Sequence, residues 1–345
     1  DAQESRGLGD VYKRQIISSI IVCGMLGTLG GGNAILGPIL VPMMAAVGVP
    51  PTVVGVLLKT AGEVGLIVGP LTGVTLITME VTGMTYAQLM LYAVIPFSVI
   101  WLAGTWIGAN KIGKELELVE TYPPEVLATS NEHIIDSKAK KTTIAFFISF
   151  LLLVGYGVYS KQGTNYALIV MILLAVIITL FSDLKAEESL NFMTKGMASQ
   201  FDMLLIFINL EVLLVLVAAG GGFDALGDFL GGIASAAGSF GVYITAALVG
   251  GFGIEAAAVA EIKIIADMFG GLASDVGLPM SVFATCILAA TRLTGSMYPT
   301  SNFAGQMGIA RSTNTKDGLR IMWIAVAFVW VWVLIWGFVG PRILG

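Results

Sequence analysis

Charge is scarce in this chain of 345 residues: 12% are Asp, Glu, Lys or Arg, whereas 56% are hydrophobic. A water-soluble domain cannot bury that much apolar surface, so the composition indicates a polytopic membrane protein. Cysteine and histidine are rarer still. Cys23 and Cys286 lie in apolar segments, which argues against a disulfide framework, and the single His133 lies in a polar loop. The sequence has no paired nucleophile and base, no metal-ligand cluster and no nucleotide motif, so we expect no enzyme and no cofactor beyond a bound Na⁺.

The first fifteen residues, DAQESRGLGDVYKRQ, have no hydrophobic periodicity and no signal-peptide layout. They run abruptly into the apolar stretch IISSIIVCGMLG, and GDVYKRQ resembles a translated sequencing adapter. We interpret residues 1–15 as an artefact. We also expect a counterpart of residues 142–238 to precede this segment in the natural protein.

The chain contains an internal repeat. Residues 47–108 align without a gap to residues 276–337, an offset of 229 positions. VGVPPTVV matches VGLPMSVF, and further on Pro70 matches Pro299. A helix-breaking proline therefore recurs at the same depth of two apolar segments, which favours a duplication over chance similarity.

Two apolar regions, 16–48 and 239–273, each consist of two short arms around a Gly-rich centre. Arms of about fifteen residues are too short to cross a bilayer comfortably, so we predict re-entrant hairpins. Five crossings from one hairpin to the next would give the two halves inverted topology, which is typical of transporters. The runs of spanning length are 53–82, 86–110, 142–160, 165–182, 202–219, 278–310 and 318–340.

The lysines predict the orientation. They gather in the loop 111–141, which the positive-inside rule places in the cytoplasm. The C-terminus is then outside the cell inner (plasma) membrane. The predicted organisation is residues 16–110 (hairpin, broken helix and closing helix of the first repeat), 111–141 (cytoplasmic loop), 142–238 (scaffold helices of the second repeat) and 239–345 (its hairpin, broken helix and closing helix).

Four interruptions recur in symmetric pairs: GGGN (30–33), GPLTG (69–73), GFGIE (251–255) and YPTSN (298–302). Helix ends that meet inside a membrane offer N–H groups to an anion and carbonyls to a cation. The alternative is a proline kink that serves only packing. For a site, we predict that substrate binds to Asn33, Thr72, Arg292, Thr300, Ser301 and Asn302, and an ion to Gly32, Gly69, Glu255 and Pro299.

The charges inside apolar segments are further candidates. The i,i+4 spacing of Lys59 and Glu63, and of Lys263 and Asp267, predicts structural ion pairs within each helix. Arg292 occupies the repeat position of Glu63, so it either pairs with that carboxylate or holds a substrate carboxylate in a bidentate bond.

The hairpins followed by proline-broken helices resemble the ion-transporter superfamily of secondary carriers. That superfamily includes dicarboxylate, citrate and gluconate permeases and the large membrane subunit of TRAP transporters. GVPPTVVGVLLKTAGEVGLIVGPLTG resembles the hairpin-to-broken-helix passage of those subunits, and YPTSN resembles their Ser-Asn-Thr substrate motif. The sequence departs from the pattern in its single proline at the break and in Phe303, where a Thr would complete the motif. The resemblance implies an all-α, elevator-type carrier.

We therefore expect secondary active transport, by symport, of a small organic anion such as a carboxylate, coupled to Na⁺ or H⁺. The alternative is a Na⁺/H⁺ antiporter with Glu255, Glu261 and Asp267 as its ligands. The long loop 111–141 favours a stand-alone carrier over a TRAP subunit that needs a separate binding protein. The expected partners are the organic anion, the coupling ion and the lipid bilayer, with a homodimer left open and no nucleic acid.

Overall fold

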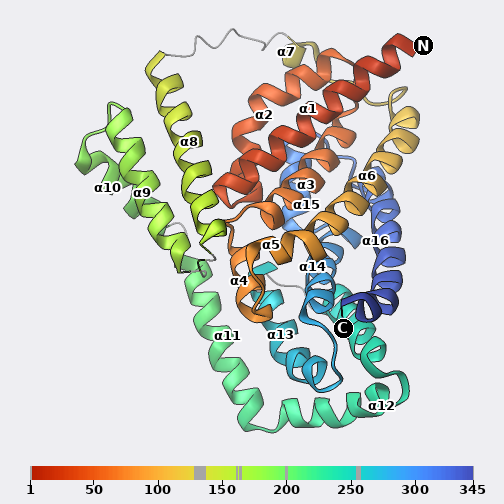
Figure 1. The fold of residues 1–345 in the computed structure, drawn as a ribbon. Coiled ribbons are helices and arrows are strands. Elements are labelled where there is room, and N and C mark those ends of the chain that lie inside the picture. Colours follow the sequence, from red (N-terminus) through yellow and green to blue (C-terminus); the bar gives the residue numbers. More distant parts are fainter. Residues whose placement is uncertain are drawn as a thin grey trace. The chain divides into compact units, whose positions relative to one another are not determined.

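A computed structural model describes residues 2–127, 137–160, 162, 165–198, 201–253 and 258–344. All the regular elements in these ranges are helices (Figure 1), as the composition predicted. In chain order they are α1 (Ala2–Leu26), α2 (Leu29–Ala46), α3 (Pro51–Val68), α4 (Gly73–Thr82), α5 (Tyr86–Leu89), the π-helix η1 (Met90–Val94), α6 (Ile95–Leu116), α7 (Pro124–Leu127), α8 (Ser137–Tyr159), α9 (Tyr166–Phe181), α10 (Ala186–Ala198), α11 (Phe201–Ala219), α12 (Gly222–Leu248), the π-helix η2 (Val249–Gly253), α13 (Ala258–Asp275), α14 (Met280–Met297), α15 (Ser301–Ile309) and α16 (Thr315–Leu344).

The helices include several of membrane-spanning character. Among the described residues, five continuous helical stretches are long and apolar enough to cross a bilayer. This confirms the prediction of a polytopic membrane protein. The five are Leu29–Ala46, Pro51–Val68, Tyr86–Leu116, Ser137–Tyr159 and Thr315–Leu344.

The chain forms two compact units, residues 132–229 and residues 1–131 together with 230–345. In the smaller unit α8 packs against α9, where Tyr166 donates a hydrogen bond of 3.1 Å to the carbonyl of Leu153. α9 is joined to α10 by the hydroxyls of Thr179 and Ser189, 2.6 Å apart. The candidate residues that the structure describes lie in the larger unit.

The larger unit repeats its helix bounds. α3 runs from 51 to 68 and α14 from 280 to 297, so both ends are 229 positions apart. The same offset relates α2, from 29 to 46, to α13, from 258 to 275. It also relates the first residue of α5, at 86, to the first residue of α16, at 315. The repeat found in the sequence thus extends to the helices before it, and residues related by this offset are called repeat mates below.

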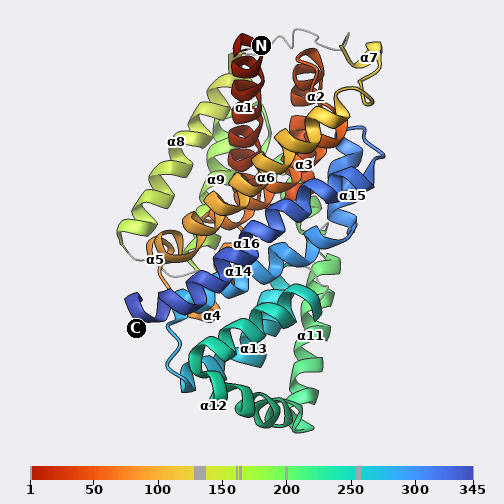
Figure 2. The ribbon, with the colours of Figure 1, turned by 90° about the vertical axis from the view of Figure 1, so that its right-hand side faces the viewer.

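The two repeats pack against each other. α2 of the first repeat packs against α15 of the second, and α13 of the second packs against α4 of the first. The closing helices α6 and α16 lie side by side (Figure 2). A Cβ on Gly104 would lie 2.7 Å from the Cα of Ala325, so a glycine lets these two helices approach.

The first helix begins earlier than expected, at Ala2 instead of residue 16. Within it, the side-chain amide of Gln15 donates a 3.1 Å hydrogen bond to the carbonyl of Val54 on α3. Tyr12 is buried edge-on against Trp106 of α6, with ring centroids 5.6 Å apart. These side chains therefore pack within the fold, whatever the origin of the segment.

The turn between α1 and α2 corrects one predicted interruption. The break falls at Gly27 and Thr28, and GGGN (30–33) lies in the first turns of α2. Gly27 adopts a φ of 67°, a left-handed conformation that glycine permits, and the Thr28 hydroxyl accepts a 3.4 Å hydrogen bond from the N–H of Gly31. The run of glycines thus predicted the region of the break correctly, but the turn itself is at Gly27 and Thr28.

The other interruptions differ in what the structure describes. α3 ends at Val68 and α4 begins at Gly73, so the predicted break at GPLTG is present. α14 ends at Met297 and α15 begins at Ser301, so the break at YPTSN is present as well. For GFGIE, η2 ends at Gly253, and residues 254–257 lie outside the described residues.

The contact of α1 with α3 yields a stability prediction. A Cβ on Gly65 would lie 2.6 Å from the carbonyl oxygen of Ile20 and 2.9 Å from the backbone nitrogen of Gly24. Because these are backbone atoms, Gly65→Ala should push the helices apart and cost about 1–3 kcal/mol of stability. Thermal unfolding of the purified protein in detergent measures the loss.

The matched control is Gly30→Ala, since nothing lies within 4 Å of a Cβ built there. It should leave the melting temperature unchanged or slightly higher. An equal loss in both variants would contradict the close approach of α1 and α3.

Candidate functional site

Asn33, predicted to bind substrate, is the centre of a buried hydrogen-bond network. Its side-chain nitrogen donates to the carbonyl of Leu58 at 2.8 Å and to Oε1 of Gln306 at 2.7 Å. Its oxygen accepts from Ser19 at 2.6 Å and from Cys23 at 3.4 Å. The amide is fully buried, and both its donors and its acceptor are engaged. Asn33 therefore joins α1, α2, α3 and α15 and leaves no side-chain donor for a ligand.

The two repeats have different residues at the positions of this network. The repeat mate of Asn33 is Ile262, at 33 and 262, and that of Gln306 is Ile77, at 306 and 77. The polar contact of α2 with α15 thus has apolar residues at the corresponding positions of α13 and α4. The first contact is specified by a buried hydrogen bond, and its counterpart carries no polar side chain at these positions.

The break between α3 and α4 supplies its own hydrogen bonds. Thr72 caps α4 by accepting from the N–H of Thr75 at 3.2 Å, and its hydroxyl also lies against the carbonyls of Leu66 and Gly69. Thr75 donates to the carbonyl of Ile67 at 2.9 Å. Because the last carbonyls of α3 have no helical N–H partner, the two hydroxyls satisfy them. Oxygens from both helix ends converge at this point.

Gly69 and Gly32, predicted ion ligands, are both places of close backbone approach. A Cβ on Gly69 would collide with the carbonyl oxygen of Gly24, and one on Gly32 would lie 2.7 Å from Sγ of Cys23. Their lack of a side chain therefore has a packing reason. The Gly69 carbonyl is still one of the oxygens that meet at Thr72.

The break between α14 and α15 is more open. Thr300 caps α15 by accepting from the N–H of Phe303 at 3.3 Å. Pro299, Ser301 and Asn302 are exposed around it. The indole of Trp323 donates to the carbonyl of Met297 at 2.8 Å, which satisfies one of the last carbonyls of α14. Polar side chains of this break are thus accessible, unlike those at Thr72.

The buried charged residues Lys59, Glu63 and Arg292 form a second cluster, which does not include Asn33. Lys59 is fully buried and lies 2.7 Å from Oε1 of Glu63, so the predicted i,i+4 ion pair is confirmed. Lys59 also donates to the hydroxyl of Ser296 on α14 at 2.8 Å. Ser296 in turn donates to the backbone carbonyl of Arg292 at 2.7 Å. The cluster therefore joins α3 of the first repeat to α14 of the second.

Arg292 is 3% exposed, and within the described residues its guanidinium makes one long hydrogen bond, of 3.5 Å, to the hydroxyl of Thr291. No ion pair joins it to Glu63, whose Oε1 pairs with Lys59. Oε2 of Glu63 is buried and has no hydrogen-bond partner among the described residues. Among the described residues, the cluster thus brings two basic side chains, Lys59 and Arg292, together with one carboxylate, Glu63.

The remaining candidates fall into two groups. Lys263 lies 3.2 Å from Asp267, which confirms the second predicted ion pair, and Glu261 is 2% exposed on the same helix. Glu255 lies outside the described residues. Sequence reasoning missed Ser296 and Gln306, whose only signal is a polar side chain within an apolar segment.

An all-helical membrane protein with interrupted helices beside buried charges has the architecture of a transport protein. The chain belongs to the family described as the tripartite ATP-independent periplasmic transporter, DctM component, which matches residues 6–339. No curated protein matches the chain.

The family settles the class of function. DctM proteins are integral inner-membrane components of secondary transporters for organic acids, and they are not an enzyme family. The antiporter alternative receives no support from the family. A component works together with other subunits, so the expectation of a stand-alone carrier is wrong. The length of the loop 111–141 was a poor guide because loop lengths vary freely among related proteins.

The Asn33 network yields a prediction about its role. Asn33→Ile leaves the Gln306 amide oxygen buried without its donor, and Gln306→Ile leaves one N–H of the Asn33 amide buried without its acceptor. Each should cost about 1–3 kcal/mol of stability. The double variant copies the isoleucines at the repeat mates, so it should cost less than the sum of the two single changes. Thermal unfolding of the four proteins measures the coupling, and strictly additive losses would contradict it.

Proposed function

We propose that this chain carries a small organic anion, a carboxylate, across the inner membrane by symport with Na⁺ or H⁺. The observation that carries the proposal is the charge imbalance of the buried cluster of Lys59, Glu63 and Arg292. It goes beyond the family, which supports transport of organic acids without naming the substrate or the coupling ion.

An unbalanced positive charge in an apolar interior is costly, because the charge loses its hydration and gains no counter-ion. A substrate carboxylate beside Arg292 would supply the missing negative charge. The guanidinium is suited to this because it offers parallel N–H donors to both carboxylate oxygens, and only one of its donors has a partner among the described residues. The exposed residues Ser301 and Asn302 offer neutral hydrogen-bonding groups to the rest of the substrate.

The coupling ion is assigned to the break between α3 and α4. The carbonyls of Leu66 and Gly69 and the hydroxyls of Thr72 and Thr75 gather there, and hard oxygen ligands of this kind suit Na⁺. The Thr72 hydroxyl lies against the carbonyls of Leu66 and Gly69. With Na⁺ bound, the same four oxygens would turn toward the cation.

The repeat of helix bounds supports a duplication. We propose that the two halves are inverted and that the helix pairs and broken helices move as one transport domain against a scaffold. The orientation with the loop 111–141 in the cytoplasm and the C-terminus outside is proposed on the positive-inside rule.

The role of Arg292 can be tested by binding. Arg292→Gln should weaken carboxylate binding roughly ten- to a hundredfold, because a hydrogen bond to a charged group is lost. Arg292→Lys should not restore the affinity, since an ammonium cannot form the bidentate bond. The measurement is the rise in melting temperature of the purified chain across a panel of mono- and dicarboxylates, followed by uptake of the radiolabelled hit with the partner subunits present.

The surface pair of Arg320 with Asp317, 2.6 Å apart, provides the matched control. Arg320→Gln should bind carboxylates like the wild type. Arg292→Gln should also melt no lower than the wild type without ligand, because it removes an unbalanced buried charge. Wild-type carboxylate affinity in Arg292→Gln would exclude the anchor role.

The ion site is tested on Thr75. Thr75→Val removes the hydroxyl at constant shape and should abolish the Na⁺ dependence of carboxylate binding, whereas Thr75→Ser should retain it. Thr78→Val is the control on the same helix, because the Thr78 hydroxyl bonds the carbonyl of Val74 at 2.7 Å within its own helix. If the wild type binds equally well in choline and in Na⁺ but responds to pH, the coupling ion is H⁺ and the Na⁺ site is wrong.

A further inference from the structure

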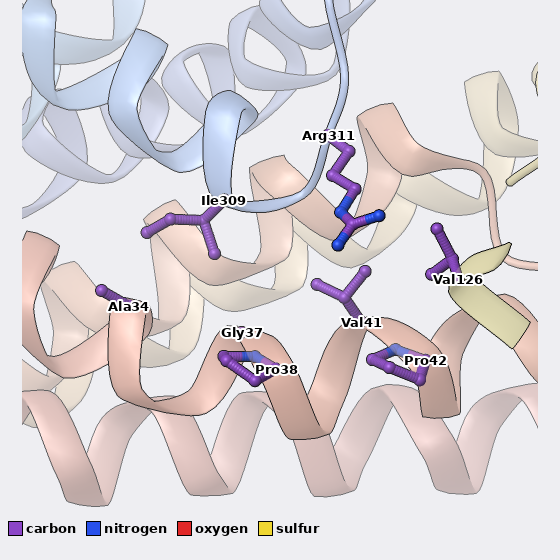
Figure 3. A pocket seen from close by; sticks show the side chains of 8 residues that line it. All are labelled: Ala34, Gly37, Pro38, Val41, Pro42, Val126, Ile309 and Arg311. Carbon is purple, nitrogen blue, oxygen red and sulfur yellow. The ribbon is translucent and has the colours of Figure 1, made fainter. Parts of the chain in front are cut away.

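A cavity is lined by residues other than those of the charged cluster. It has a volume of about 270 Å³ and is lined by α2, by Val126 of α7 and by the end of α15 (Figure 3). The lining residues of α2 recur every three or four positions along one helix face, and Ile309 closes the far wall. They are Ala34, Gly37, Pro38, Val41 and Pro42.

One cation faces this apolar groove. Arg311 extends from the turn after α15 toward Val41, as Figure 3 shows. Its side chain makes no hydrogen bond or ion pair within the part of the chain that the structure describes. Its backbone has a φ of 58°, in the left-handed region that glycine or asparagine usually fills at the end of a helix. An arginine is thus held in an unfavourable conformation at the edge of the groove.

The same helix face also provides free acceptors. Pro38 and Pro42 lie inside α2 and have no N–H to donate, so the carbonyls of Ala34 and Pro38 lack the hydrogen bonds that a regular helix would give them. Both residues line the groove. A ligand seated there would meet a guanidinium donor, two backbone acceptors and an apolar wall.

The outer face of α2 continues this apolar character. Ile35 and Ile39, next to the lining residues in sequence, are 62% and 52% exposed. In a membrane protein such residues face lipid chains or another apolar partner. A small free anion would gain nothing from the apolar wall, whereas an amphiphile buries its chains there and keeps its charge at Arg311.

We propose that this groove binds an anionic phospholipid, with its phosphate on Arg311, hydroxyls of its headgroup on the carbonyls of Ala34 and Pro38, and an acyl chain along α2. A glycerol headgroup fits this chemistry because it combines an anionic phosphate with hydroxyl donors. The lipid would bridge α2 of the first repeat and the end of α15 in the second. Lipid binding would therefore stabilise the contact that the Asn33–Gln306 hydrogen bond also makes.

The test is native mass spectrometry of the delipidated full chain in detergent, with dimyristoyl phosphatidylglycerol added. The matched control lipid is dimyristoyl phosphatidylcholine, whose headgroup has no hydroxyl donor and whose net charge is zero. The wild type should retain one phosphatidylglycerol and lose phosphatidylcholine. Arg311→Asn should lower the retained fraction about tenfold or more. Asparagine tolerates the left-handed backbone, so this variant should fold at least as stably as the wild type.

Lys316→Asn, which removes an exposed charge on the next helix, is the control and should retain the lipid. Ala34→Trp fills the groove from an exposed position and should abolish retention while Arg311 is still present. Wild-type retention in Arg311→Asn or in Ala34→Trp would overturn the proposal. So would displacement of the lipid by an equal concentration of inorganic phosphate, which would mark a site for free anions.

Discussion

The structure depends on one constraint: a peptide group inside a bilayer must find a hydrogen-bond partner within the protein. A helix that stops in mid-membrane leaves its last carbonyls and first N–H groups without one. Threonine meets this need at the three breaks that the structure describes in full, because one hydroxyl can accept from an N–H and donate to a carbonyl. Thr28, Thr72 and Thr300 all cap the helix that follows a break. The chain can thus interrupt its apolar helices without a penalty that would unfold them.

The two repeats share their backbone but differ in their side chains. α3 and α14 have the same length and repeat position, yet Lys59 has Leu288 as its repeat mate and Glu63 has Arg292. A duplicated frame would otherwise produce two equivalent sites. Because Glu63 and its repeat mate Arg292 carry opposite charges, and Lys59 has an apolar mate, the two copies do not form equivalent sites. The duplicated helices therefore provide the backbone framework, and the positions at which the two repeats differ provide the buried charged groups.

Local features were predictable from the sequence and tertiary partners were not. Pro70 and Pro299 located two breaks because proline acts on its own helix, and the spacing of Lys59 and Glu63 was enough to predict their ion pair. GGGN did not locate the turn, since three glycines allow a break without requiring one. Gly27, and none of the glycines at 30–32, has the left-handed conformation. The partners of Asn33 come from positions up to 273 residues away, which no local pattern encodes. Symmetry suggested Arg292 as the partner of Glu63, but in the structure Oε1 of Glu63 pairs with Lys59, one turn away on the same helix.

The pairing of Glu63 with Lys59 is consistent with the proposed role of Arg292 as a substrate anchor. A lysine four residues from Glu63 forms its pair inside one helix at little entropic cost, whereas Arg292 would have to reach from another repeat. Ser296 then fixes Lys59 between the two helices through a neutral hydroxyl, which adds no further charge. The guanidinium remains buried, and its charge is not balanced within the cluster. In a member of an organic-acid transporter family, the counter-ion of such a group is most simply the cargo, and binding would then restore neutrality before the charge moves through the membrane.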